Sequence, residues 1–240
     1  MAGEGQRFLN AGYNVPKPLI EIDGLPMVVQ AAKTLPPADK WIFICREEHV
    51  QEYGIDQTLD SFFPGAKIIS VGYLTMGQAS TCLLAKEYLR PDDSLTIGAC
   101  DNAMDYDLHV LEDKLSHADA LVWTFRKNPT VLRNPKMYGW VEIDQTGQAK
   151  KISCKSPISK QPLNDHAVVG TFSFKRAETF IRCVDSMIDK DRRINNEFYM
   201  DVALDEGIQL GCVVLPLEVK KYICWGTPKD LIEYQKGSND

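Results

Sequence analysis

Residues 1–18 read MAGEGQRFLNAGYNVPKP, and the organisation of the whole chain can be worked out from this stretch. A Gly3-x-Gly5 turn comes first, Arg7 follows, and Lys17 stands between two prolines. Glycines let backbone N–H groups approach an anion closely because no Cβ is in the way. The prolines hold Lys17 in a stiff, extended backbone, which suits a positioned cation. The stretch therefore predicts a loop that binds a polyphosphate.

Two better-known phosphate-binding motifs do not fit these residues. The dinucleotide-binding fingerprint would need its third glycine where Phe8 stands, and the lysine-serine pair of the P-loop is absent. A short Gly-x-Gly turn with one arginine is by itself more often a solvated loop than a phosphate site. The prediction depends on the glycines, Arg7 and Lys17 taken together.

Composition and charge narrow the class of protein. The chain has 240 residues, of which 44% are hydrophobic and 25% charged, as in an ordinary globular protein. Its net charge of −6 argues against a general nucleic-acid surface, which needs many cations. No apolar run is long enough for a bilayer span, and the N-terminus lacks the basic-then-apolar pattern of a signal peptide, so we expect a cytoplasmic protein without membrane contact. The seven cysteines are scattered without a C-x-x-C pair, which indicates neither disulfides nor a zinc site.

Strand-like and helical patterns alternate along the first half of the chain. Apolar runs of strand length at 41–45, 67–71, 94–98 and 120–125 are separated by segments with helical periodicity, which predicts an α/β fold with a parallel sheet. After residue 138 the pattern changes to a β-hairpin over 138–153, a strand over 167–174 and helices over 176–189 and from Asn196 onward. Further strands are expected at 209–215 and 221–224, and Thr227 is expected to cap a last helix.

Asp101 and Asn102 lie just beyond the carboxyl end of the predicted strand at 94–98. Ligands of open α/β sheets bind outside the carboxyl ends of the strands. A carboxylate there could hold Mg²⁺ beside phosphates, although an isolated aspartate after a strand is equally often a turn or cap residue.

These features together resemble one family. The Gly3-x-Gly5-x-Arg7-Phe loop, the Pro-Lys17-Pro spacing and the Gly226-Thr-Pro-x-Asp-Leu tail resemble the sugar-phosphate nucleotidyltransferases, the nucleoside-diphosphate-sugar pyrophosphorylases, and a bacterial subset of them most closely. The resemblance spans nearly the whole chain. It implies a Rossmann-like, mostly parallel but mixed sheet flanked by helices, of the GT-A-like type, with a small β-rich acceptor-binding portion. We expect one domain over 1–240, with a nucleotide-binding part at about 1–130 and an acceptor-binding part at about 131–240.

The resemblance implies a reaction and its partners. The enzyme would condense a nucleoside triphosphate with a sugar phosphate, or a similar phosphorylated small molecule, and release pyrophosphate with the help of Mg²⁺. Such a product belongs to nucleotide-sugar biosynthesis, as for capsule or other cell-surface polysaccharide. Neither nucleic acid nor membrane is expected as a partner, and homo-oligomer formation is left open.

The resemblance also assigns roles on the nucleotide side. Arg7 would neutralise the β- and γ-phosphates, Lys17 would approach the α-phosphate, and Asp101 would be the metal ligand. Gln78 would offer a donor and an acceptor to a base edge. The nucleotide-binding set is Ala2, Gly3, Glu4, Gly5, Gln78, Asp101 and Asn102.

On the acceptor side, the resemblance implies that Lys155 holds the acceptor phosphate and that Glu197 contacts sugar hydroxyls. Gly139 would lie beside the sugar, and Val169 and Gly170 would form the adjacent strand edge.

Two departures from the family pattern keep other functions open. Cys154 replaces the glutamate of a Glu-Lys pair, and Cys224 stands where many members carry a second metal-binding aspartate. One alternative is a GT-A glycosyltransferase that uses a nucleotide sugar, but its Asp-x-Asp motif is lacking at Asp101, although Asp105 and Asp107 are near. The other alternative is a non-catalytic relative that binds nucleotides.

In the family that this chain resembles, a buried strand precedes the glycine loop, whereas this sequence starts at the loop with Met1. Without that strand, apolar neighbours and backbone polar groups would be exposed. We therefore expect a version with about eight additional upstream residues, a typical strand with its lead-in, to have a higher thermal midpoint. Equal midpoints for the two versions would contradict this expectation.

Overall fold

The computed structural model describes residues 5–237, which form two compact units interleaved along the sequence. The first unit contains the described parts of Met1–Thr75, Gly98–Met104 and Ile223–Asp240, and the second contains Met76–Ile97 and Asp105–Tyr222. The family resemblance instead predicts a single division of the chain, at about residue 130. Its single-domain assignment stays a prediction.

The first unit is built around a parallel strand pair. Strands β3 (Ile42–Arg46) and β4 (Lys67–Val71) pair in register, with Ile42 opposite Lys67. Alternate residues of β3 are buried, so this strand is not buried on both faces as a continuous apolar run suggests. Phe43 packs with Ile55 and Leu59 of α4 (Ile55–Phe62) in one apolar cluster. The other elements of the unit are α1 (Gln6–Asn10), a 3₁₀ turn (Lys17–Leu19), β1 (Glu21–Ile22), β2 (Leu25–Pro26), α2 (Met27–Lys33), α3 (Glu47–Gln51) and α10 (Pro228–Gly237).

The predicted cap of the last helix is confirmed. The Thr227 hydroxyl accepts a hydrogen bond from the Asp230 N–H (3.2 Å) and donates one to its carboxylate (2.6 Å). Helix α10 contributes buried Leu231 to a second apolar cluster with Phe8, Met27 and Trp225. Two strands whose residues are divided between the units, β6 (Asn102–Asp105) and β12 (Lys221–Cys224), pair with each other.

The second unit contains a six-stranded mixed sheet in the order β11-β7-β10-β8-β9, with β5 also paired to β10. β11 runs parallel to β7, while β10 is antiparallel to both β7 and β5. Thus β5, β7 and β11 share one direction and β10 opposes them, within the mixed α/β class that the sequence indicates. The strands are β5 (Leu95–Ile97), β7 (Ala120–Phe125), β8 (Gly139–Ile143), β9 (Ala149–Cys154), β10 (His166–Phe174) and β11 (Val214–Glu218).

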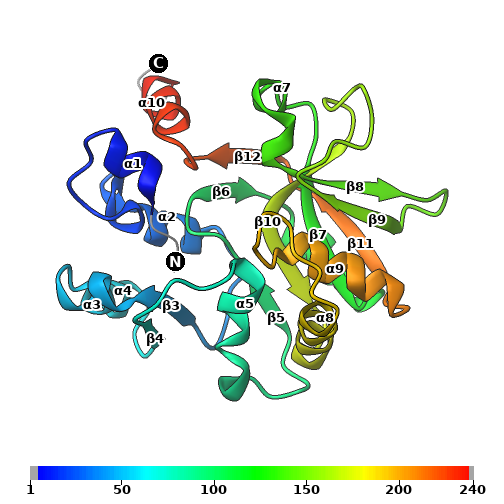
Figure 1. Cartoon of the computed structure of the whole chain (residues 1–240), viewed down its shortest axis with the longest axis horizontal. Coiled ribbons are helices and arrows are strands. Elements are labelled where there is room, and N and C mark those ends of the chain that lie inside the picture. The colour runs from blue at the N-terminus through cyan, green and yellow to red at the C-terminus, as the bar shows by residue number, and fades with distance from the viewer. Residues whose placement is uncertain (1–4, 238–240) are drawn as a thin grey trace. The chain divides into compact units, whose positions relative to one another are not determined.

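Helices α8 (Ala177–Asp189) and α9 (Met200–Gln209) pack against each other and against this sheet (Figure 1). Their apolar residues, including Phe180 and Met187, join Phe172 and Phe174 of β10 in the core of the unit. All six residues of β7 are buried, which fits a strand covered on both faces. The shorter helical elements are α5 (Gln78–Leu83), α6 (Leu108–Ser116), α7 (Thr130–Arg133) and 3₁₀ turns at Lys86–Tyr88 and Pro135–Met137.

Two helix predictions differ from the structure at their ends. In residues 77–89, one of the segments with helical periodicity between the predicted strands, the α-helix ends at Leu83 and is followed only by a 3₁₀ turn. The helix expected from Asn196 begins at Met200, because Asn195 and Asn196 have left-handed backbone (φ 52° and 63°) that cannot continue a helix. Glu197 therefore precedes α9 rather than belonging to it. The helix also extends through Gln209, so the predicted strand at 209–215 is observed later, at Val214–Glu218.

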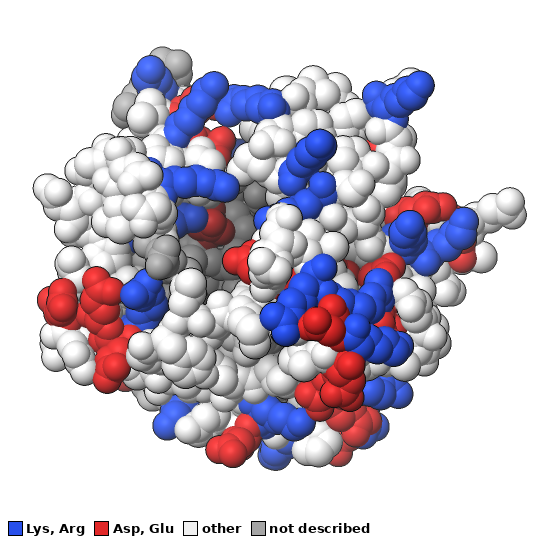
Figure 2. Space-filling view, viewed as in Figure 1, with Lys and Arg blue, Asp and Glu red and all other residues white. Residues whose placement is uncertain are grey.

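A buried carboxylate ties α8 and α9 together. Glu206 is 0% exposed and accepts hydrogen bonds from Ser186 (2.8 Å), Arg192 (2.6 Å) and Lys190. Burial acts to raise the pKa of Glu206, but these three donors outweigh it and lower the pKa to about 2. Figure 2 shows that basic and acidic side chains are interspersed over this region rather than forming a patch of one sign.

We expect Glu206→Gln to reduce the free energy of unfolding by roughly 1.5–3 kcal/mol, the range for hydrogen bonds to charged groups. A lowered pKa means that the contribution is complete above the ordinary value of 4.5 and is lost as the pH falls from there toward about 2. Urea titrations at neutral and acidic pH measure both effects. Glu112→Gln is the matched control, because the Glu112 side chain is 65% exposed. Equal destabilisation by the two variants at neutral pH would contradict the role of Glu206.

Candidate active site

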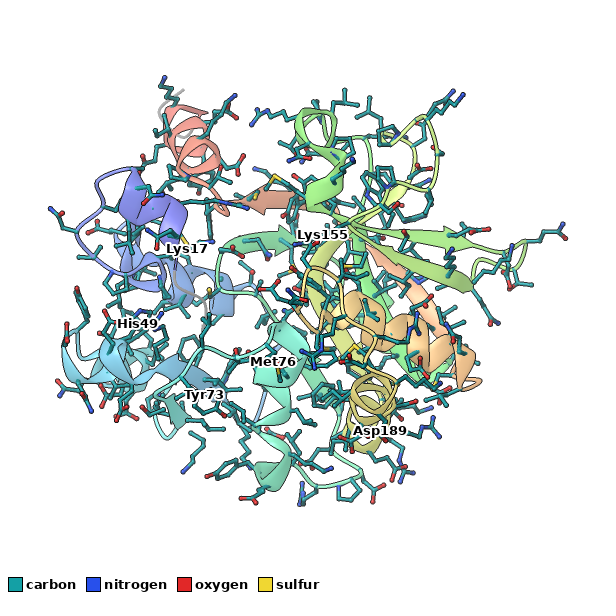
Figure 3. The ribbon with its side chains drawn as sticks, viewed as in Figure 1. Lys17, His49, Tyr73, Met76, Lys155 and Asp189 are labelled. Carbon is teal, nitrogen blue, oxygen red and sulfur yellow. The ribbon has the colours of Figure 1, made fainter. Side chains whose placement is uncertain are left out.

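In the first unit, Lys17 and Asp101 form a direct ion pair. The Lys17 ammonium donates to Asp101 Oδ2 at 2.5 Å and to the Gly226 carbonyl at 3.2 Å, and its side chain is 16% exposed. Burial acts to lower the pKa of Lys17, but attraction to Asp101, interactions with Cys100 and Cys224 and the hydrogen bond to Asp101 together outweigh it, so the pKa is raised. The lysine therefore keeps its charge in a largely enclosed position, labelled in Figure 3.

The loop around Lys17 is shaped by its contact with Gly5. Gly5 has left-handed backbone (φ 64°) at the start of α1, and a Cβ added there would lie 3.3 Å from Lys17 Cβ. The ring of buried Phe8 lies 5.4 Å from the Lys17 ammonium. Arg7 is exposed on α1. Gly5 and Lys17, which are twelve positions apart in the sequence, thus come together, and the two cations differ in burial.

Asp101 is the one predicted metal ligand. Within residues 5–237, no cluster of three or more His, Cys, Asp or Glu side chains could hold a metal ion. Near Asp101 stands Cys224, whose sulfur accepts the Gly226 N–H at 3.3 Å. Mg²⁺ prefers oxygen ligands and commonly takes one or two carboxylates together with substrate phosphates. The residues therefore fit Mg²⁺ only as an ion shared with bound phosphates, with Asp101 as its carboxylate ligand.

In the second unit, Lys155, Tyr199 and Glu197 form a hydrogen-bonded chain. The Lys155 ammonium donates to the Tyr199 hydroxyl at 2.5 Å, and this hydroxyl donates to Glu197. Lys155 directly follows β9, at the end where Gly139 of β8 pairs with Cys154 (Figure 3). Lys155 and Glu197, which the resemblance assigns to one substrate, are therefore linked through a tyrosine that sequence reasoning did not select.

A second carboxylate lies next to this chain. Asp201 is hydrogen-bonded to the Cys154 thiol, and burial raises the Asp201 pKa to about 6, although Cys154 and Lys155 act to lower it. Any Cβ at Gly139 would collide with the Asp201 carboxylate. Gly139 is thus required for close packing against Asp201, a reason different from contact with a sugar.

The predicted base-recognition turn is hydrogen-bonded to β10 and to the segment that contains Glu197. The amide of Gln78 donates to the Gly170 carbonyl at 3.3 Å. On the backbone, the Phe198 N–H donates to Met76 O at 2.7 Å and the Ala79 N–H donates to Phe198 O at 3.0 Å. The Gln78 turn and the residue after Glu197 are consequently held together by main-chain hydrogen bonds.

The remaining predicted residues have varied environments. Val169 is buried on β10, so its side chain packs inside the protein, and Gly170 adopts φ 97° at an irregularity of that strand. Asn102 is buried at the start of β6. Ala2, Gly3 and Glu4 lie outside the described residues.

Sequence reasoning missed Gly226, Tyr199 and Asp201. The spacing Glu197-x-Tyr199-x-Asp201, with polar residues at every second position, was the available signal for the last two. No sequence signal pointed to the carbonyl of Gly226, because the identity of a side chain does not predict the contacts of its main chain.

Comparison with solved structures gives the fold. A nucleoside-diphosphate-sugar pyrophosphorylase from Vibrio cholerae RC9 superposes with a TM-score of 0.80 at 20% identity, covering 98% of both chains. An inositol-1-phosphate CTP transferase from T. maritima gives 0.75 at 14% identity, covering 98% of this chain and 91% of that one. A Bacillus anthracis protein assigned as a glucose-1-phosphate thymidylyltransferase, in complex with sucrose, gives 0.75 at 18%, covering 99% and 92%.

Among the described residues, no helix has both the length and the apolar character needed to cross a bilayer.

The sequence itself identifies the family. No curated protein matches it. The profile of the nucleotidyl transferase family, however, matches residues 1–233, nearly the whole chain. The chain therefore belongs to the nucleotidyl transferase family and is a nucleotidyltransferase enzyme.

Proposed function

We propose that this nucleotidyltransferase condenses a nucleoside triphosphate with a sugar phosphate, or a similar phosphorylated small molecule, and releases pyrophosphate. The observation that carries the proposal is the enclosed Lys17 ammonium, which lies against the Gly5 turn and Asp101. Transfer requires an acceptor oxygen in line with the α-phosphorus and stabilisation of the charge that develops there. A preorganised, permanently charged lysine supplies that stabilisation.

On the nucleotide side, Lys17 would contact the α-phosphate and exposed Arg7 would neutralise the departing pyrophosphate. Gly5, with Ala2, Gly3 and Glu4 before it, would contribute backbone N–H groups, while Gln78 would contact the base and Asn102 would belong to the same nucleotide-binding set. Asp101 would hold Mg²⁺, which when bound screens phosphate charge. The Lys17 ammonium bonds only Oδ2 of Asp101, and a carboxylate has a second oxygen for a metal ion.

On the acceptor side, Lys155 would bind the acceptor phosphate and Glu197 a hydroxyl. Their link through Tyr199 supports this pairing, because it keeps a cation and a carboxylate close together without a direct ion pair. Gly139, Val169 and Gly170 would contribute backbone and shape rather than side-chain contacts.

A substrate screen tests the proposal. Each nucleoside triphosphate is combined with a panel of sugar, polyol and amino-alcohol phosphates, with Mg²⁺, and pyrophosphate is measured. Pyrophosphate from at least one pair is expected. Free nucleoside diphosphate from a nucleotide sugar would instead indicate a glycosyltransferase. Binding of nucleotide without turnover across the panel would indicate a non-catalytic relative.

Lys17→Ala is expected to lower the turnover number by about 10²-fold or more, since a single preorganised contact to developing charge is worth that much. The fold should persist, which circular dichroism can verify. Lys33→Ala, an exposed lysine at the end of α2, is the control and should leave turnover unchanged. Retained turnover in Lys17→Ala would refute its role.

Gly77→Ala is expected to raise the KM values for both substrates. Gly77 has φ 106°, and its Cβ would lie 2.7 Å from Phe198 O and 2.8 Å from Phe198 N, so the backbone joining Gln78 to the acceptor segment must shift. Gly147→Ala is the matched control, because it shares the positive φ (86°) but has nothing within 4 Å. If steady-state kinetics gave the two variants the same constants, the main-chain link would have no part in substrate binding.

A further inference from the structure

We propose that Tyr199 positions the ammonium group of Lys155 for the phosphate of the acceptor, an inference that rests on the proposed function of Lys155. The observation that carries it is the hydrogen bond from the Lys155 ammonium to the Tyr199 hydroxyl, 2.5 Å long, together with the onward bond to Glu197.

The backbone of Lys155 is already fixed by the fold. Its φ of 54° is left-handed, an unfavourable conformation for a residue other than glycine, and its N–H donates to Tyr138 O at 3.1 Å. The side chain beyond it is flexible, and holding a lysine in one rotamer costs conformational entropy. Tyr199 supplies the distal contact, because the ammonium also lies 4.4 Å from its ring centroid. Both ends of the Lys155 side chain are thereby restrained.

The hydroxyl of Tyr199 is free to accept a hydrogen bond from a cation through its lone pairs. Its single proton is donated to Glu197, which leaves its lone pairs for Lys155. Burial, followed by the bond to Glu197, keeps the pKa of Tyr199 well above its ordinary value, so the hydroxyl stays neutral. A phosphate approaching Lys155 therefore meets no phenolate charge.

Lys155 can bind a phosphate while it keeps its hydrogen bond to Tyr199. An ammonium has three donors, and the tyrosine takes one. The other two remain for phosphate oxygens at a position fixed by the ring. Because Glu197 is exposed at the other end of the chain, the same three residues favour acceptors that carry a phosphate and a hydroxyl in one molecule.

Phosphate binding can be measured without turnover. The full-length protein is treated with acetic anhydride at rising concentrations of inorganic phosphate, and acetylation of Lys155 is followed by mass spectrometry. Phosphate should protect Lys155 in the wild type, and Tyr199→Phe should need about tenfold more for half protection, as expected for the loss of one hydrogen bond at a charged group. The inference would be overturned if wild type and Tyr199→Phe needed the same phosphate concentration for half protection, or if phosphate did not protect Lys155 in the wild type.

The control is Tyr234→Phe, because the Tyr234 hydroxyl also donates to a carboxylate, Asp23, at 2.5 Å. It should leave protection of Lys155 unchanged. A shift as large as that of Tyr199→Phe would show that loss of any such hydroxyl is sufficient, and the inference would fail.

Kinetics with an active substrate pair separate this inference from the proposed function. Tyr199→Phe should raise the KM for the acceptor about tenfold and leave the KM for the nucleoside triphosphate unchanged, a split that general loosening of the fold would not produce. An unchanged acceptor KM would overturn the role of Tyr199 and leave the function intact. Tyr199-dependent protection without pyrophosphate from any pair would overturn the function and leave the phosphate site.

Discussion

The second unit depends on the pairing of β10, which has neighbours along both of its edges. One edge pairs with β7, and the other pairs with β8 near its start and with β5 near its end. Between the part of β10 that pairs with β8 and the part that pairs with β5, its register with β7 shifts, from Val168 to Phe172. Gly170 lies in this interval with a backbone that favours glycine. The strand that holds the core together thus also shapes the edge to which Gln78 is bonded.

Lys17 of the first unit and Lys155 of the second follow one electrostatic principle, each within its own unit. Lys17 contacts a carboxylate directly, whereas Lys155 reaches one through a phenol. A cation enclosed by protein needs a compensating partner, or its charged form becomes unfavourable. A partner that is too strong would hold the cation away from its substrate. In the direct pair the carboxylate contacts the Lys17 ammonium itself, whereas in the mediated pair the Tyr199 hydroxyl stands between the Lys155 ammonium and Glu197.

Patterns of side chains predicted much of the fold and part of the site. The strands at 67–71 and 120–125, the hairpin and the Thr227 cap followed from apolar runs and turn chemistry, which are local. The start of α9 did not, because two left-handed asparagines override helical periodicity. Lys17 and Asp101 were both selected, but their contact joins residues 84 positions apart. Tyr199 and the Gly226 carbonyl were not predicted, because their roles depend on the residues that tertiary packing places beside them.

The interleaved order of the two units affects how this protein can be rearranged. The chain passes from one unit to the other after residues 75, 97, 104 and 222. Neither unit is encoded by one uninterrupted stretch, so neither can be exchanged between relatives by a single recombination event. A crossover at any one point would combine partial units of different parents and disturb packed interiors. Diversity in this chain is therefore expected to accumulate by substitution within loops rather than by exchange of modules.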